Sequence, residues 1–151
     1  MAYVWKTGSQ IKADPNAAGA QFEQLEKTAG VTAETVLNAN KSKSAPLHNE
    51  FEWNNGTAAH LYRLHQSRHC IGSLCKVVET EEQQEIEVRA FLKTTAEAPY
   101  ESINVIIQNE DKREAMLARA LKELQAFMTK YEMLKELQPV REIMEDIIER
   151  I

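Results

Sequence analysis

The chain has 151 residues, enough for one domain or for two small units that share a core. Hydrophobic residues make up 43% and charged residues 27%, which argues against wholesale disorder and for a buried core. No segment contains the roughly 18 consecutive apolar residues of a membrane span, and residues 1–6 lack the pattern of a signal peptide. Two cysteines cannot form a disulfide scaffold. We therefore expect a soluble, cytoplasmic protein without membrane partners.

The N-terminal part of the chain predicts two short helices. Asp14 and Pro15 indicate a helix start, because aspartate caps a helix and proline fits its first position. Gly30 is a natural stop for this helix. Thr32 predicts the cap of a second helix that ends near Asn40, and the short connection predicts that the two helices pack at an angle.

The segment that follows completes a helical module. Residues 41–46 are polar and contain a proline, which predicts a loop. Apolar and polar residues then alternate over 47–53, and this pattern predicts an extended segment with one face turned inward. A helix is expected over about 55–71. Residues 1–71 thus predict a helical module with a helix-turn-helix-like arrangement.

Residues 72–151 predict an antiparallel meander followed by a helical oligomerisation region, so the fold class is α+β. The expected strands cover residues 74–78, 85–93 and 100–107. Alternation in the second strand places Phe91 on one side and four apolar residues on the other, namely Ile86, Val88, Ala90 and Leu92. In the third strand, Ile103, Val105 and Ile107 lie on the same side. A long amphipathic helix is expected from Asn109 or Asp111, with a kink or break at Pro139.

A mixed pattern of proline, histidine, aromatic and arginine residues runs through the middle of the chain. It comprises Pro46-Leu47-His48, Phe51-Glu52-Trp53, Ala58-Ala59, Tyr62-Arg63 and Gln66-x-Arg68. On these residues the chain resembles a family of small proteins encoded by bacteriophages and prophages. The resemblance extends to Trp5-Lys6-x-Gly8, the Ala18-Gly19 helix, Ala120-Leu121-x-x-Leu124 and Leu137-x-Pro139-Val140, and it departs from the family pattern at Ser67 and His69-Cys70. The family has no settled activity, so the resemblance implies a phage or prophage setting and no mechanism.

Charge is distributed unevenly along the chain, although the total is −5. Residues 54–78 contain three basic and no acidic residues, whereas residues 79–114 carry a net charge of −6. The basic segment lies on the third expected helix and predicts a nucleic-acid interface in which four side chains contact phosphates. These side chains are Lys41, Lys43, Arg63 and Arg68. The alternative is a solvated helix face whose arginines pair with Glu50, Glu52 or the acidic turn.

Metal and catalytic sites are not expected. His65 and His69 lie four residues apart on a predicted helix and could share one face, as zinc ligands do. His60, Cys70 and Cys75 lie nearby in the sequence, but no C-x-x-C pair or nearby carboxylate completes a tetrahedral set of ligands with His65 and His69. The extended segment predicts that His48, Glu50 and Glu52 share one side, but no nucleophile motif or glycine-rich phosphate loop accompanies them. We expect no catalytic residues, no metal and no cofactor.

The apolar stripes of the last two helices allow two interpretations. They form either a helical hairpin that covers the sheet or a dimer interface, and their width favours a two-fold homodimer. The predicted interface residues are Leu117, Leu121, Leu124, Met128, Ile143 and Ile147.

Two functions from different classes follow. The favoured one is a non-enzymatic phage accessory protein that binds nucleic acid or a nucleoprotein complex as a dimer. The alternative is a protein-binding module, such as an inhibitor of a host defence enzyme, or a structural assembly component. The partner surface of this alternative is acidic and consists of Glu79, Glu81, Glu82, Glu85 and Glu87.

Overall fold

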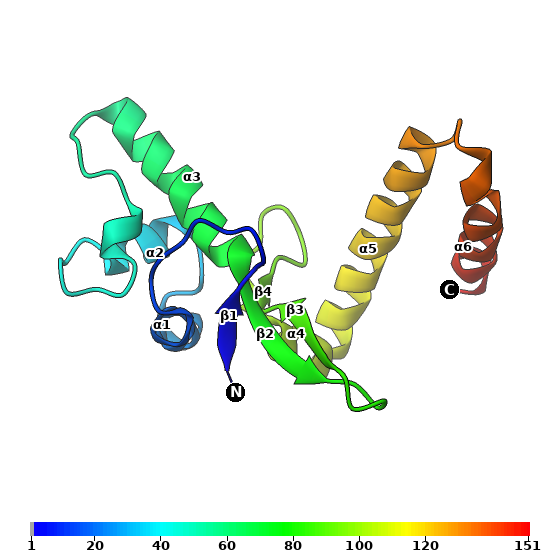
Figure 1. The fold of residues 1–151 in the computed structure, drawn as a ribbon, viewed down its shortest axis with the longest axis horizontal. Coiled ribbons are helices and arrows are strands. Elements are labelled where there is room, and N and C mark those ends of the chain that lie inside the picture. Colours follow the sequence, from blue (N-terminus) through cyan, green and yellow to red (C-terminus); the bar gives the residue numbers. More distant parts are fainter. Residues whose placement is uncertain (1) are drawn as a thin grey trace.

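The computed structural model describes residues 2–151 and has the predicted α+β architecture. Figure 1 shows two parts: a body of helices and strands (residues 2–108) and a C-terminal hairpin of two helices (residues 110–151) that extends away from it. In chain order the elements are β1 (Tyr3–Trp5), α1 (Pro15–Thr28), α2 (Ala33–Ala39), η1 (His48–Glu50), α3 (Thr57–Ser73), β2 (Leu74–Glu79), β3 (Glu85–Arg89), β4 (Phe91–Leu92), β5 (Glu101–Ser102), α4 (Ile103–Gln108), α5 (Glu110–Lys130), η2 (Lys135–Leu137) and α6 (Gln138–Arg150). No helix within residues 2–151 is long and apolar enough to span a membrane.

The first two helices begin at the predicted caps. The Asp14 carboxylate accepts a hydrogen bond from the Asn16 N–H at 3.0 Å. The Thr32 hydroxyl accepts one from the Thr35 N–H at 3.0 Å, and the Thr35 hydroxyl accepts one in return from the Thr32 N–H at 2.9 Å. Such a capping box satisfies two amide groups that a helix end leaves free. Both helix starts are confirmed.

The predicted extended segment at 47–53 is wrong, because the chain forms the short helix η1 there. Leu47 and Phe51 are buried four residues apart, a spacing that suits a helical turn as well as alternation. The His48 ring stacks on Trp53 with 4.7 Å between centroids, and Glu50 accepts hydrogen bonds from backbone N–H groups before α1. His48, Glu50 and Glu52 therefore do not form one polar face.

The three-stranded antiparallel sheet has the order β1-β2-β3. Strands β2 and β3 were both expected, but the third strand is β1, which pairs with β2 so that Val4 lies opposite Cys75. The predicted strand at 100–107 is wrong: β5 covers only two of its residues and pairs with β4 in a separate sheet.

Helix α4 replaces the rest of that predicted strand. The Ser102 hydroxyl accepts a hydrogen bond from the Val105 N–H at 3.4 Å and caps the helix. Ile103, Ile106 and Ile107 are spaced as i, i+3 and i+4, so the same residues also fit a helix. Ile106 is buried beneath the turn. The cap at Ser102 and the burial of Ile106 favour the helical period over the period of two that a strand requires.

The predicted strand at 85–93 is interrupted at Ala90. The Ala90 N–H donates to the Leu74 carbonyl at 3.0 Å, and the Ala90 carbonyl accepts from the Ile103 N–H at 2.9 Å. Ala90 and Phe91 are both buried, so the predicted alternation, which places them on opposite sides of one strand, does not continue through this segment. The Phe91 ring packs edge-on against Phe22 of α1 at 5.4 Å between centroids. This bend joins the sheet to the helical core.

The C-terminal helices are interrupted earlier than predicted. Helix α5 ends at Lys130, a turn and η2 follow, and α6 returns beside α5 (Figure 1). Pro139 lies in the first turn of α6 and does not kink a continuous helix. Proline is tolerated there because the first N–H groups of a helix have no intrahelical partner.

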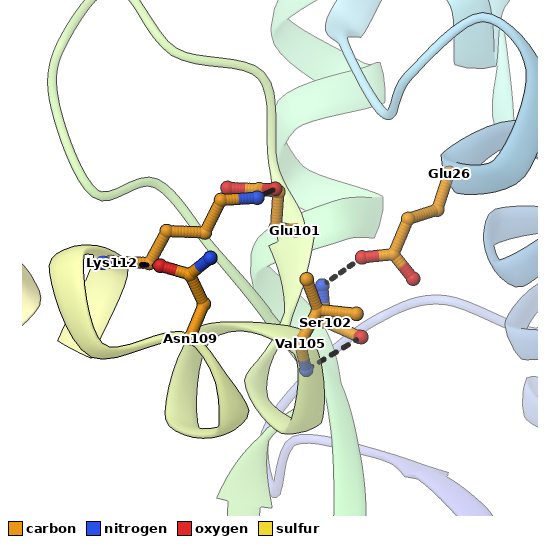
Figure 2. Close-up of polar contacts among 6 residues, drawn as sticks. All are labelled: Glu26, Glu101, Ser102, Val105, Asn109 and Lys112. Atoms are coloured by element: carbon orange, nitrogen blue, oxygen red, sulfur yellow. Dashed lines mark hydrogen bonds and ion pairs between the residues drawn. The ribbon is translucent and has the colours of Figure 1, made fainter.

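A short polar network attaches the C-terminal hairpin to the body (Figure 2). Lys112, in the first turn of α5, forms an ion pair with Glu101 of β5. The Asn109 side chain accepts a hydrogen bond from the Lys112 N–H at 3.0 Å and caps α5. Glu26 of α1 accepts one from the Ser102 N–H. These contacts fix the start of α5 relative to α1 and β5.

Candidate nucleic-acid interface

Three basic side chains and one histidine line one pocket at the junction of the helices and the sheet. Lys6 follows β1, Arg68 and His69 lie in the last turns of α3, and Arg89 ends β3. The pocket has a volume of about 260 Å³, and its remaining lining is Thr7, Gly8, Ser9, Gly72 and Ser73. We call it the basic pocket; none of its lining residues is acidic.

The strand order explains why these residues meet. Helix α3 continues directly into β2, and the Lys6 N–H donates to the Ser73 carbonyl at 2.6 Å beside that junction. β3 pairs with β2 so that Arg89 lies opposite Cys75. A Cβ at Gly72 would lie 3.1 Å from Arg89 Nη2, so the missing side chain gives the guanidinium room against α3.

The positive charge of the basic pocket is not neutralised by the protein. Lys6, Arg68, His69 and Arg89 are all exposed. None of them forms an ion pair with a carboxylate within residues 2–151. Hydroxyl groups of Thr7, Ser9 and Ser73 add hydrogen-bonding capacity. Such a set of groups favours an anion, because charge-assisted hydrogen bonds to oxygen anions are stronger than neutral ones.

The four residues predicted to contact phosphates lie at three places. Arg68 lines the basic pocket. Lys41 and Lys43 are exposed on the loop between α2 and η1, and neither lines the basic pocket. The Arg63 guanidinium donates to the carbonyls of Glu52 and Asn54 and lies over the Trp53 ring, 5.2 Å from its centroid.

Neither arginine follows the alternative prediction of carboxylate pairing. Within residues 2–151, Arg63 and Arg68 have no carboxylate within ion-pair distance, and Arg63 contacts the backbone carbonyl of Glu52, not its side chain. Arg63 holds the segment before α3 in place. Phosphate contact by Lys41, Lys43 and Arg63 stays a prediction.

Lys6 and Arg89 are pocket residues that the sequence did not indicate. Lys6 belongs to the Trp5-Lys6-x-Gly8 pattern, which gives no sign of its neighbours. Arg89 lies in a strand beside glutamates, where charge counting assigns it to the acidic segment. Only the pairing of β1 and β3 on either side of β2 brings both to the end of α3.

The β2–β3 turn carries the predicted acidic surface. All five glutamates are exposed, and within residues 2–151 none of them forms an ion pair. Glu79 and Glu85 lie directly opposite each other in the register of β2 and β3. Like charges in this position destabilise a strand pair. This acidic turn is at the opposite end of β3 from Arg89.

The C-terminal hairpin leaves most of the predicted dimer interface exposed. Leu117, Leu124, Ile143 and Ile147 are exposed by 43%, 44%, 62% and 45%, whereas Leu121 is half-buried. Met128 is buried, next to a cavity of about 430 Å³ that α6 also lines through Arg141, Met144 and Ile148. We call the four exposed residues the apolar stripe.

The histidines and cysteines do not converge on a metal site. Residues 2–151 contain no group of three histidine, cysteine, aspartate or glutamate side chains that could hold an ion. His60 lies 3.7 Å from Glu34, and His65 stacks near Tyr62. Burial raises the pKa of the Cys70 thiol to about 12 and also raises the pKa of Cys75. Both thiols are protonated at neutral pH, which is unsuited to a nucleophile or metal ligand.

Three surfaces of the described residues each gather one kind of side chain. They are the basic pocket, the acidic turn and the apolar stripe. Comparison of the chain with protein-family models, with curated proteins and with solved structures finds no match.

Proposed function

We propose that the chain is a non-enzymatic accessory protein of a phage or prophage that binds nucleic acid, alone or in a nucleoprotein complex, as a dimer in the host cytoplasm. The observation that carries the proposal is the basic pocket. Lys6, Arg68 and Arg89 converge there together with His69, without a carboxylate among them. A phosphate group supplies the missing negative charge and several acceptor oxygens. The phage setting rests on the central sequence pattern.

The basic pocket suits a backbone phosphate better than a free anion in bulk solvent. Its three basic residues and His69 are exposed, so a polymer can approach without a structural rearrangement. Lys41 and Lys43 are exposed on the loop between α2 and η1, outside the basic pocket, and are proposed as separate phosphate contacts for a longer strand. About three phosphate contacts give a slope of roughly −3 in a plot of log affinity against log salt concentration.

Dimerisation is supported by the apolar stripe. Its side chains belong to helices that already form a hairpin, and an exposed apolar surface bordered by polar residues is typical of an interaction site. Two hairpins related by a two-fold axis form a four-helix arrangement. A dimer carries two basic pockets, and linking them raises the affinity for a long polyanion.

Fluorescence anisotropy with labelled DNA tests the nucleic-acid proposal. Wild type is compared with Arg68→Ala/Arg89→Ala at two salt concentrations. Arg113→Ala/Arg150→Ala removes the same charge from the C-terminal hairpin and is the matched control. We expect a loss of at least about 10-fold in affinity for the pocket variant and a shallower salt dependence, since each lost contact removes about one counterion.

Two results contradict this proposal. One is the absence of binding by the wild type at low salt. The other is an equal loss of DNA affinity in the pocket variant and the control variant, because binding would then depend on the net charge of the protein and not on the basic pocket. Arg63→Ala is kept out of the pocket test, since its guanidinium stabilises the segment before α3.

The acidic turn supports the alternative function, a protein-binding module. Glu79 opposite Glu85 costs stability within the sheet, and a basic partner surface relieves that repulsion. Glu81→Lys/Glu82→Lys reverses charge at the turn without touching the β2–β3 ladder. Capture of a specific protein from nuclease-treated host lysate by the wild type, and its loss in this variant, is expected for the alternative. Capture that survives the reversal contradicts it.

A further inference from the structure

A second cavity lies next to the basic pocket. It has a volume of about 390 Å³, which is within the range of ligand sites, and it lies between α5 and the segment that follows β3. Arg89 lines both cavities. The remaining lining residues are Phe91, Leu92, Lys93, Tyr100, Met116, Arg119, Ala120 and Glu123. We call this second cavity the apolar groove.

The lining of the apolar groove combines an apolar surface with a basic border. Leu92, Met116 and Ala120 provide aliphatic surface, and Tyr100 provides a half-buried ring. Lys93 Nζ lies 5.0 Å from the centroid of that ring. This combination matches a flat, weakly polar group attached to an anion.

The wall of the groove on α5 is held by its own contacts. Arg119 pairs with Glu123 at 3.1 Å and donates to the Lys93 carbonyl at 2.6 Å. Among the described residues that line the groove, Glu123 is the one carboxylate, and Arg119 offsets its charge, so Arg89 and Lys93 dominate the charge of the groove. The hydrogen bond from Arg119 to Lys93 connects the α5 wall of the groove to the segment that follows β3.

We infer that the basic pocket and the apolar groove together bind a single-stranded nucleic acid, with a backbone phosphate in the pocket and an unpaired base in the groove. The inference rests on the proposed nucleic-acid function and names its substrate class. In a duplex, the bases are stacked on their neighbours and cannot enter a lateral groove. A single strand can turn a base outward, and contacts between bases and apolar or aromatic side chains do not depend on sequence.

The inference is tested with three probes of equal length. They are a labelled single-stranded DNA, the matched duplex, and a single strand whose central nucleotides are abasic. The full chain is expected to bind the single strand at least about 10-fold more tightly than either of the others. This size is expected because each contact between a base and an aromatic side chain contributes about 1–3 kcal/mol in single-strand binding proteins. This comparison uses only the wild type, so it does not depend on the folding of a variant.

A groove variant locates the effect. Ala120 is exposed on α5 and lines the groove, so Ala120→Phe fills the groove without changing charge. Ala126→Phe, at an exposed position of the same helix outside the groove, is the matched control. We expect Ala120→Phe to lower the affinity for the single strand to about that for the abasic strand and to leave abasic binding unchanged.

The outcomes separate the inference from the proposed function. Equal affinity for the single strand, the duplex and the abasic strand overturns the inference but preserves the nucleic-acid function. The same holds if Ala120→Phe and Ala126→Phe behave alike. Binding of none of the probes at low salt overturns both.

Discussion

The body and the C-terminal hairpin bury their apolar side chains to very different degrees. In the body, Phe22, Leu37, Ile71, Leu74 and Phe91 form part of one continuous core and are almost inaccessible to solvent. In the hairpin, only Met128 is buried, whereas Phe127, Ile143 and Ile147 remain largely exposed. Both parts have amphipathic helices, but only the body provides a surface that covers them.

This difference shows what an amphipathic pattern does and does not specify. The pattern indicates that a helix requires an apolar surface opposite its own, but it does not identify that surface. For α1, the opposing surface includes Phe91 at the bend that follows β3. For α5 and α6, the facing helix covers only part of the apolar residues. The body buries its apolar residues internally, whereas the hairpin leaves its apolar stripe exposed.

The largest effect is expected when the same substitution is made in the two parts. Phe22→Ala removes a fully buried ring that packs against Phe91, and the cavity left behind should lower the free energy of unfolding by about 3–5 kcal/mol. Phe127 is 52% exposed, so Phe127→Ala should lower it by about 0.5 kcal/mol in the monomer. Urea unfolding at low protein concentration measures both. Similar losses in the two variants would contradict the division into a packed body and an open hairpin.

A smaller effect concerns how β1 is attached to the body. A Cβ at Gly19 of α1 would lie 2.2 Å from a ring carbon of Tyr3, whose hydroxyl donates to Glu23. Alanine normally stabilises a helix relative to glycine, but here it must displace a buried ring. We expect Gly19→Ala to destabilise the fold by about 1–3 kcal/mol in thermal or urea unfolding.

Gly72→Ala is the matched control for that substitution. Its added methyl group meets only the flexible end of Arg89, at 3.1 Å, so its effect on stability should be small. Because Arg89 must then shift within the basic pocket, this control should instead weaken DNA binding. A stabilising effect of Gly19→Ala would show that the packing of Tyr3 on α1 is not required.

The third effect is a dependence of stability on pH that arises in the body and not in the C-terminal hairpin, because both cysteines lie in the body. Burial raises the pKa of Cys70 from 9.0 to about 12. Below pH 9 the thiol is protonated in both states, so this contribution to stability is fully present. Above pH 9 the unfolded chain releases the proton while the folded chain keeps it, so stability falls until the pH passes 12. At pH 10 the loss is about 1.4 kcal/mol.

Urea unfolding at pH 7 and pH 10, at constant ionic strength, measures this loss. Cys70→Ala should reduce the difference between the two pH values, because the titrating group is removed. The loss of the thiol sulfur lowers stability at both pH values, so the comparison rests on the difference. An unchanged difference in Cys70→Ala would assign the alkaline effect to other groups.

Local signals in the sequence predicted much of the fold. The predicted caps at Asp14 and Thr32 act over two and three residues and are present, and of the two starts expected for the long helix, Asn109 is the residue that caps α5. Segments that fit two periods were assigned wrongly. Ile103, Ile106 and Ile107 satisfy a helical spacing, while Ile103 and Ile107 also satisfy alternation. Local sequence cannot choose between these periods when capping and tertiary burial decide.

The candidate site was less accessible to sequence analysis. Arg68 was identified because it lies in an acid-free segment on a helix. Lys6 and Arg89 are 62 and 21 positions away from Arg68 in the chain and meet it only through the pairing of β1 and β3 with β2. Charge counted along the chain averages Arg89 with neighbouring glutamates. In the fold, Arg89 lies at the other end of the strand from Glu85.

The smallest effect on monomer stability should accompany the loss of the dimer. Leu124→Lys/Ile143→Lys places two charges on the apolar stripe, where the side chains are exposed by 44% and 62%. Ala126→Lys/Gln138→Lys adds the same charge at exposed positions outside the stripe and is the matched control. We expect sedimentation velocity to show a dimer for the wild type and the control, and a monomer for the stripe variant. The free energy of unfolding at low protein concentration should change by no more than about 0.5 kcal/mol in either variant, because neither disturbs the core of the body.

A monomeric wild type at high concentration contradicts dimerisation. A stripe variant that remains a dimer would place the interface elsewhere, and the hairpin would then expose its apolar residues for a different molecule.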